Sequence, residues 1–243
     1  INVRFLLMIV SHEHKFIFIK TRKTAGTSIE IGLSKYCGPK DVISPIGKDE
    51  ELRESLGFPG PQNTILPIYQ YRKWDLWNLL KGGGFAHHFN HTPAKLMKKR
   101  LGGAIFDNYL KFCGVRNPWD MAVSLYNWEV FGPKKGVDSS TSFKEFLERR
   151  SNDLLTNSSI FMSEGEVLVD EFVKFESLES DLEIISEKIG LGKIELPRAK
   201  SGFNKEKRHY SLYYDDKSID FIRGVCKIEI ELFGYEFDDR RPA

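Results

Sequence analysis

The stretch KTAGTS at residues 23–28 combines residue types that bind phosphate. Lys23, with Lys20 just upstream, supplies positive charge, and Gly26 lets the backbone come close to a ligand. Hydroxyl donors come from three further residues, Thr24, Thr27 and Ser28. The stretch follows an apolar run at 16–19 and precedes a helical pattern, which predicts a turn from a buried strand into a helix. Because the first N–H groups of a helix lack helical partners and lie at the positive end of its dipole, this turn is a candidate anion site.

The order of these residues differs from the nucleotide-triphosphate loop G-x-x-x-x-G-K-[ST], in which the lysine follows the glycines and a hydroxyl residue binds magnesium. Here Lys23 precedes Gly26, and the stretch gives no reason to expect a metal. Taken alone, an ordinary strand-to-helix turn capped by Thr or Ser explains the pattern equally well.

A second stretch, VRNPWDMAVSLY at 115–126, follows another predicted strand in the same way. Asn117 and Pro118 predict a turn, and proline suits the first position of a helix. Ser124 lies about two turns into that helix, so Arg116 folded back along it could share one ligand with the hydroxyl. Alone, such an arginine is more often a structural ion-pairing residue. Two phosphate sites on neighbouring strand-helix units would require a nucleotide with phosphates at both ends.

Together the two stretches resemble the sulfotransferase family that uses 3′-phosphoadenosine 5′-phosphosulfate (PAPS). KTAGTS is similar to its 5′-phosphosulfate loop, and VRNPWDMAVSLY is similar to its 3′-phosphate motif. Three further segments, NHTPAKLMKKRLG, VDEFVKFESLESDL and RHYSLYYDD, occur in the order expected for the Golgi-type and bacterial carbohydrate branch, resembling heparan sulfate 2-O-type sulfotransferases. Met121 departs from the motif because the family commonly has arginine there.

The resemblance implies a P-loop-kinase-like sulfotransferase fold and transfer of the sulfuryl group from PAPS to a hydroxyl or amine of an acceptor. The acceptor would be a small molecule or an oligosaccharide, the product nucleotide adenosine 3′,5′-bisphosphate, and no metal would be required. Lys23 would neutralise the charge that grows on the departing phosphate. The implied nucleotide contacts are Arg22, Lys23, Thr24, Ala25, Gly26, Thr27, Ser28, Arg116, Ser124, Lys207 and Arg208.

A hydroxyl acceptor also needs a base, and imidazole is the common choice near neutral pH. FAHHFNHT places His87, His88 and His91 in one loop after a glycine run. The resembled family can use a histidine in an H-x-[TS]-[AP] context, so His91 is the first candidate for the base and His88 the second. The close spacing also suggests a metal site, but no nearby Cys, Asp or Glu completes it. Surface or capping histidines are the third alternative.

Strands and helices alternate along the chain, which predicts one α/β domain over 1–243 with a central parallel sheet flanked by helices. A Gly- and Pro-rich segment at 38–84 is expected to be a variable insertion over one end of the sheet. Within it, Trp74 and Trp77 are either a sugar-stacking platform or core residues. The predicted strands are 16–19, 109–115 and 167–175. The predicted helices include one that Thr92 caps, with Pro93 at its first position and its end at Gly102, one beginning at Pro118, one after Ser142, one after Ser177, and 215–231.

A net charge of +2 over 243 residues does not indicate nucleic-acid binding. No segment reaches the ~20 apolar residues of a membrane span, and three widely spaced cysteines, Cys37, Cys113 and Cys226, indicate core thiols in a reducing compartment. We therefore expect a cytoplasmic, bacterial protein, with a Golgi-lumen domain whose anchor has been removed as the alternative. The competing functions are a nucleotide kinase of related fold and a non-catalytic nucleotide- or glycan-binding protein.

Overall fold

The computed structural model describes residues 8–66, 68, 71, 73–82, 93–132, 137–150, 152–197 and 208–242. The chain divides into two compact units, each with its own hydrophobic core. The first unit comprises Ile1–Thr21, Ala25–Gly114 and Ile160–Ala199, and the second comprises Arg22–Thr24, Val115–Ser159 and Lys200–Ala243. The expectation of a single domain over 1–243 stays a prediction.

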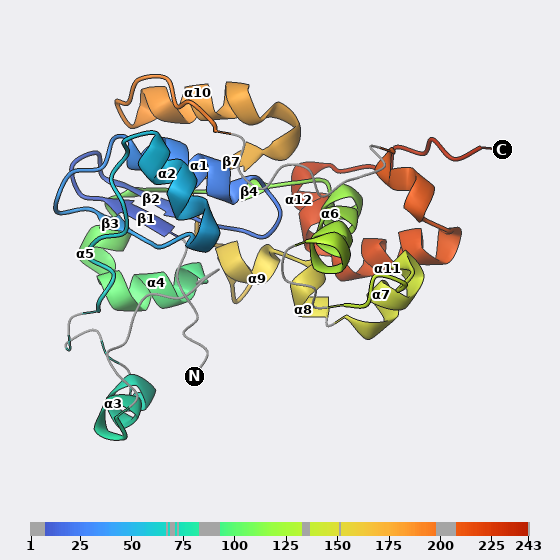
Figure 1. Cartoon of the computed structure of the whole chain (residues 1–243), viewed down its shortest axis with the longest axis horizontal. Coiled ribbons are helices and arrows are strands. Elements are labelled where there is room, and N and C mark those ends of the chain that lie inside the picture. The colour runs from blue at the N-terminus through green and yellow to red at the C-terminus, as the bar shows by residue number, and fades with distance from the viewer. Residues whose placement is uncertain are drawn as a thin grey trace. The chain divides into compact units, whose positions relative to one another are not determined.

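The first unit is built on a five-stranded sheet in the order β3-β1-β2-β4-β7 (Figure 1). Its strands are β1 Met8–Ser11, β2 Phe16–Ile19, β3 Val42–Ile43, β4 Leu110–Val115 and β7 Glu171–Lys174. Strand β2 runs parallel to β4, with Ile19 opposite Cys113. Strand β1, which the sequence pattern did not predict, runs antiparallel to both β2 and β3. The α/β class is confirmed, but the sheet is mixed rather than parallel because β1 and β2 form a hairpin.

Helices pack on the sheet of the first unit. Helix α1, Gly26–Ser34, and helix α10, Leu178–Lys188, share one core with the strands through Ile29, Leu33, Leu182 and Ile185. Helices α4, Ala94–Leu101, and α5, Gly103–Phe106, lie on the opposite side of the sheet from α10 (Figure 1). Other short elements also lie apart from the helices of the second unit. They are η1 Gly47–Asp49, α2 Glu50–Ser55, α3 Lys73–Leu80, α9 Ser158–Phe161, the β5–β6 hairpin of Met162–Ser163 and Glu166–Val167, and η3 Phe175–Ser177.

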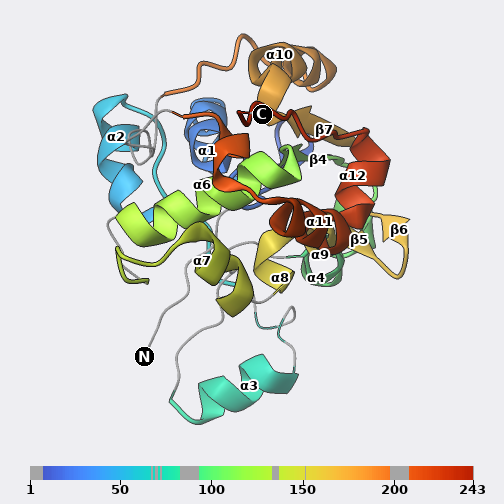
Figure 2. The ribbon, with the colours of Figure 1, turned by 90° about the vertical axis from the view of Figure 1, so that its right-hand side faces the viewer.

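The second unit is helical and has an aromatic core. Its elements are α6 Pro118–Phe131, α7 Phe143–Arg149, α8 Asn152–Leu155, η4 Tyr210–Tyr213, α11 Asp216–Val225 and α12 Lys227–Phe233. Figure 2 shows α7 and α11 beside α6. Trp119 Nε1 donates to the carbonyl of Ile219 at 3.1 Å, and the Tyr214 hydroxyl donates to the carbonyl of Trp119 at 2.8 Å. These bonds satisfy the polar ends of buried aromatic side chains, and they connect α6 with α11 and with the residue that follows η4.

Several predicted elements are confirmed at the positions that their sequence signals indicated. Strand β2 occupies 16–19, and α4 ends before Gly102, which has a positive φ of 81°. Ser142 begins α7 with a capping box in which its side chain accepts from the N–H of Glu145. The three cysteines are buried, and burial raises the pKa of Cys37 to about 12.

Three expectations about element bounds are wrong, as is one of the two alternatives for Trp74 and Trp77. Helix α4 begins at Ala94, and Pro93, which was expected at the first helical position, is the N-cap residue. The predicted strand at 167–175 is shorter in the structure, where β7 covers Glu171–Lys174. Just before it, the N–H of Asp170 donates to the carbonyl of Lys111, and the carboxylate of Asp170 accepts from the N–H of Lys111. The predicted helix at 215–231 divides into α11 and α12 at Cys226, whose buried thiol donates to the carbonyl of Leu155 at 3.0 Å. Trp74 and Trp77 are not core residues, since they are 68% and 46% exposed. In the part of the chain that the structure describes, no helix has both the length and the apolar character needed to cross a bilayer.

Candidate functional site

The turn between β2 and α1 has an unusual backbone conformation at two residues. Lys23 has a φ of 60° and Ala25 a φ of 58°, whereas Thr24 between them keeps a negative φ. Left-handed backbone costs roughly 1–3 kcal/mol at residues other than glycine and is retained where function requires it. Left-handed residues within a turn can direct successive N–H groups toward one side, which is the arrangement of an anion-binding concavity.

The N-terminus of α1 suits an anion. Ala25 occupies the N-cap position without a side-chain cap bond, and the first turn contains no acidic residue. Thr27 and Ser28, which the sequence analysis predicted as hydroxyl donors, lie in this first turn and are buried. The positive end of the helix dipole is therefore not compensated by an acidic side chain of the first turn.

Gly26 is required at the first position of α1 by close packing. A Cβ atom there would lie 2.6 Å from Cγ of Lys20, so a larger residue would displace the lysine. Lys20 itself is buried, and its Nζ pairs with Oε2 of Glu30 at 3.0 Å. The charge of Lys20 is therefore directed toward Glu30, and Lys23 is the lysine that lies in the strained turn.

The turn between β4 and α6 is built by side chains. Asn117 caps α6 by accepting from the N–H groups of Trp119 and Asp120, and Pro118 is the first helical residue, as predicted. Arg116 folds back along α6, where its Nε lies 2.8 Å from Oδ2 of Asp120. Its Nη1 donates to the carbonyl of Lys23 at 2.9 Å. Arg116 thus connects its own turn directly to the backbone of the KTAGTS stretch.

One face of α6 continues from this arginine contact. Asp120, Ser124 and Trp128 are spaced by four residues, so they lie in one row along the helix. Ser124 is partly exposed, and Nζ of Lys23 lies 4.8 Å from the ring centroid of Trp128. The ammonium of Lys23 therefore lies against the same helix whose N-terminal turn carries Arg116.

Arg22 is held by the protein. Its Nη1 donates to the carbonyls of Asp153 and Thr156 at 3.2 and 3.1 Å. Burial lowers the pKa of the Arg22 guanidinium, and the nearby charge of Asp153 partly opposes this. These contacts point to a structural role for the side chain, and its predicted contact with the nucleotide stays a prediction.

The remaining predicted site residues are only partly described. His87, His88, His91 and Lys207 lie outside the described residues. Arg208 is exposed, with its guanidinium carbon 4.0 Å from the ring centroid of Tyr213. Among the residues that the structure describes, no three His, Cys, Asp or Glu side chains form a group that could hold a metal ion.

Two residues near Lys23 were not predicted as functional. Trp128 belongs to the apolar pattern of α6 and gave no signal apart from its four-residue spacing from Ser124. Asn157 lies in the polar segment TNSS, 135 residues from Arg22, yet both polar atoms of its amide bond to the Arg22 backbone. Contacts of this kind between remote segments have no signature in a single sequence.

The fold and the site define an α/β protein with two candidate anion-binding turns that follow parallel strands. Over 104 residues the sequence is 35% identical to an uncharacterized protein from Archaeoglobus fulgidus, a match that spans 41% of this chain and 82% of the relative. The chain belongs to the same family as this archaeal protein, which has no stated activity.

Two other comparisons add little. No protein-family model matches the sequence. A solved structure, that of a sulfotransferase from Alicyclobacillus acidocaldarius, is 15% identical with a TM-score of 0.44, and the match covers 90% of this chain and 96% of that one. This degree of likeness establishes neither a shared fold nor a shared reaction.

Proposed function

We propose that the protein is a PAPS-dependent sulfotransferase. The observation that carries this proposal is the bond from Arg116 Nη1 to the carbonyl of Lys23, within the alternating left-handed segment. It supports a donor site in which one anion-binding turn is attached to the other. A nucleotide with phosphates at its 3′ and 5′ positions has the chemistry that two such turns select.

In the proposed reaction, the acceptor oxygen or nitrogen forms a bond to sulfur while the bond from sulfur to the 5′-phosphate oxygen breaks. The acceptor proton goes to a base, and adenosine 3′,5′-bisphosphate leaves with the bonding electrons. Lys23 neutralises the charge that grows on the departing phosphate, while Ala25, Gly26 and the neighbouring hydroxyl residues Thr24, Thr27 and Ser28 hold that phosphate. Arg116 and Ser124 bind the 3′-phosphate, and Lys207 and Arg208 provide further nucleotide contacts.

We propose His91 as the base, with His88 as the second choice. His91 directly precedes the Thr92-Pro93 pair that leads into α4, which would fix its position. His91→Ala should lower kcat by roughly 10²–10⁴-fold with a hydroxyl acceptor, while affinity for adenosine 3′,5′-bisphosphate changes little. Full activity of His91→Ala combined with an inactive His88→Ala would assign the base to His88, and normal activity of the variants at His87, His88 and His91 would exclude the loop.

A carbohydrate acceptor is supported by α3. The rings of Trp74 and Trp77 stack with centroids 4.8 Å apart, and Nζ of Lys81 lies 4.0 Å from the Trp77 ring centroid. Exposed indole rings bind the apolar faces of sugars, and a neighbouring cation favours glycans that already carry negative groups. We therefore propose a saccharide as the acceptor class.

The test is a transfer assay with PAPS labelled in its sulfuryl group, run against a panel of oligosaccharides and small hydroxyl and amine acceptors. Label should move to an acceptor in the presence of a chelator, at a rate that added magnesium does not change. A parallel reaction with labelled ATP and magnesium tests the kinase alternative. Phosphate transfer from ATP without sulfuryl transfer from PAPS would overturn the proposal, and tight nucleotide binding without any transfer would indicate a binding protein.

A further inference from the structure

The amide of Asn157 forms two hydrogen bonds with the backbone of one residue. Oδ1 accepts from the N–H of Arg22 at 2.9 Å, and Nδ2 donates to the carbonyl of Arg22 at 3.0 Å. Asn157 is only 4% exposed, so water does not compete effectively for these bonds. An amide carries a donor and an acceptor in one plane, and the pair of bonds fixes the peptide groups on both sides of Arg22.

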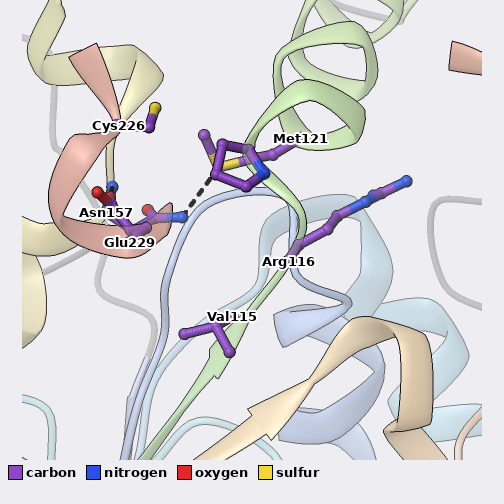
Figure 3. A pocket seen from close by; sticks show the side chains of 7 residues that line it. Val115, Arg116, Met121, Asn157, Cys226 and Glu229 are labelled. Carbon is purple, nitrogen blue, oxygen red and sulfur yellow. Dashed lines mark hydrogen bonds between the residues drawn. The ribbon is translucent and has the colours of Figure 1, made fainter. Parts of the chain in front are cut away.

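Asn157 is itself fixed by a buried carboxylate. Oε1 of Glu229, on α12, accepts from the N–H groups of Asn157 and Ser158 at 2.7 and 2.9 Å, and also from the hydroxyl of Thr156. Hydrogen bonds to a carboxylate are stronger than those between neutral groups. Figure 3 shows Asn157 and Glu229 side by side, with a dashed line from the Asn157 amide to the sulfur of Met121, 3.1 Å away.

A small cavity of about 10 Å³ lies beside this carboxylate. Its lining includes Asn157 and Glu229, and Oε2 of Glu229 is buried without a hydrogen-bond partner among the residues that the structure describes. The volume is at the lower limit for one water molecule and excludes a substrate. Arg116 also lines the cavity, but Figure 3 shows its side chain extending away from Glu229, consistent with its pairing to Asp120. The cluster therefore acts on the backbone of the turn and not on a ligand.

Three hydrogen bonds together hold two consecutive residues, Arg22 and Lys23, at the start of the turn between β2 and α1. Asn157 holds the N–H and the carbonyl of Arg22, and Arg116 holds the carbonyl of Lys23. Lys23 has its left-handed φ of 60° directly after the peptide group that Asn157 fixes. Strained backbone persists only where the surrounding structure fixes its conformation. These hydrogen bonds fix the backbone on both sides of Arg22 and the carbonyl of Lys23.

We infer that Asn157, held by Glu229, is a positioning residue that keeps Lys23 in its left-handed conformation. This inference rests on the proposed function, in which Lys23 meets the departing phosphate. Loss of the Asn157 bonds would release the strain at Lys23 and move its ammonium. A misplacement of about 1 Å costs as much as 10²-fold in rate when a reacting group must be aligned.

The kinetic test compares Asn157→Ala and Glu229→Ala with Glu229→Gln. Both alanine variants should lose about 10- to 100-fold in kcat while KM for PAPS changes less than about threefold. Glu229→Gln keeps the acceptor oxygen and should retain activity within a few-fold of the wild type. Asn108→Ala is the matched control, because Asn108 is exposed and its side chain donates to a carbonyl of its own neighbourhood, that of Ala104. Wild-type kcat in Asn157→Ala would overturn the inference.

A second readout does not depend on the reaction. Amide hydrogen exchange of a peptide covering residues 20–28, measured without ligand, should accelerate in Asn157→Ala and Glu229→Ala but not in Glu229→Gln or Asn108→Ala. Peptides from the core of α6 should keep their protection, which separates local release from global unfolding. If the wild type proved to have no transferase activity, faster exchange would still support positioning of the turn, and unchanged exchange would overturn it.

Discussion

Helices α1 and α6 each follow one of a pair of parallel strands, but their N-termini are completed in different ways. Helix α6 has Asn117 as a cap, Pro118 at its first position and Asp120 in its first turn. Helix α1 has Ala25 at the cap position and no acidic residue in its first turn. The side chains of the sequence thus satisfy the N-terminus of α6, whereas the N-terminus of α1 is the one at which we propose that phosphate binds.

The difference predicts that the two turns would bind phosphate in different ways. In the proposed site, backbone N–H groups and short hydroxyl side chains at α1 would surround the phosphate, so affinity would depend on backbone conformation. At α6, the helix end is already compensated by Asn117 and Asp120, and the positive charge comes from the guanidinium of Arg116. The bond from Arg116 to the carbonyl of Lys23 connects the turn before α6 with the segment just before Ala25.

The largest effect that this comparison predicts is at Lys23. Lys23→Ala removes the charge opposite the departing phosphate and leaves the cost of the left-handed backbone unchanged, since alanine is also not glycine. We expect kcat to fall by roughly 10²–10³-fold while affinity for adenosine 3′,5′-bisphosphate falls much less. Steady-state kinetics and calorimetry measure the two quantities. Lys48→Ala, at an exposed lysine, is the control, and near-normal turnover of Lys23→Ala would remove its assigned role.

A smaller effect is expected at Ala25, where a substitution can give the N-terminus of α1 an acidic side chain, as α6 already has. Ala25→Asp places a carboxylate at the end of α1, in a left-handed conformation that Asp tolerates. Like-charge repulsion should lower affinity for adenosine 3′,5′-bisphosphate by about tenfold or more. Ala25→Asn has nearly the same shape without the charge and should bind within a few-fold of the wild type. Equal affinity of the Asp and Asn variants in calorimetry would mean that no phosphate binds at this helix end.

The smallest effect concerns stability at the other helix end. Asn117→Ala removes the cap of α6 and the bond from Asn117 Nδ2 to the carbonyl of Glu236. Loss of such a cap costs about 1 kcal/mol in the free energy of unfolding, which denaturant titration can measure. The same titration on Asn108→Ala should show a change within about 0.5 kcal/mol, as for an ordinary surface substitution. An Asn117→Ala protein as stable as the wild type would show that α6 does not depend on its cap.

Local signals in the sequence predicted much of the fold. Strand β2, the Pro118 start of α6 and the Ser142 cap of α7 each follow from residues within a few positions of one another. The mixed sheet was not predictable in this way, because β1 is a four-residue apolar segment whose strand conformation depends on pairing with β2 and β3. Asp170, just before β7, and Cys226, between α11 and α12, likewise contact distant partners, Lys111 and Leu155, that local sequence signals do not indicate.

The candidate site shows the same division between local and distant causes. The residue types of KTAGTS predicted an anion site, and the structure adds the left-handed conformations of Lys23 and Ala25, which no propensity of Lys or Ala indicates. The sequence predicted Arg116 either as a phosphate contact or as a structural ion-pairing residue, and the structure shows its pair with Asp120. The bond from Arg116 to Lys23 joins residues 93 positions apart in the sequence. The bonds between Asn157 and the backbone of Arg22 join residues 135 positions apart.

The central claim is that the two turns bind one nucleotide with phosphates at both ends, and it is tested most directly by calorimetry with adenosine 3′,5′-bisphosphate and AMP. We expect the wild type to bind the bisphosphate about 10- to 100-fold more tightly, the range that a charged hydrogen bond to the 3′-phosphate supplies. Arg116→Ala should bind the two nucleotides with similar affinity. Equal affinities in the wild type, or a preference that survives in Arg116→Ala, would contradict the account.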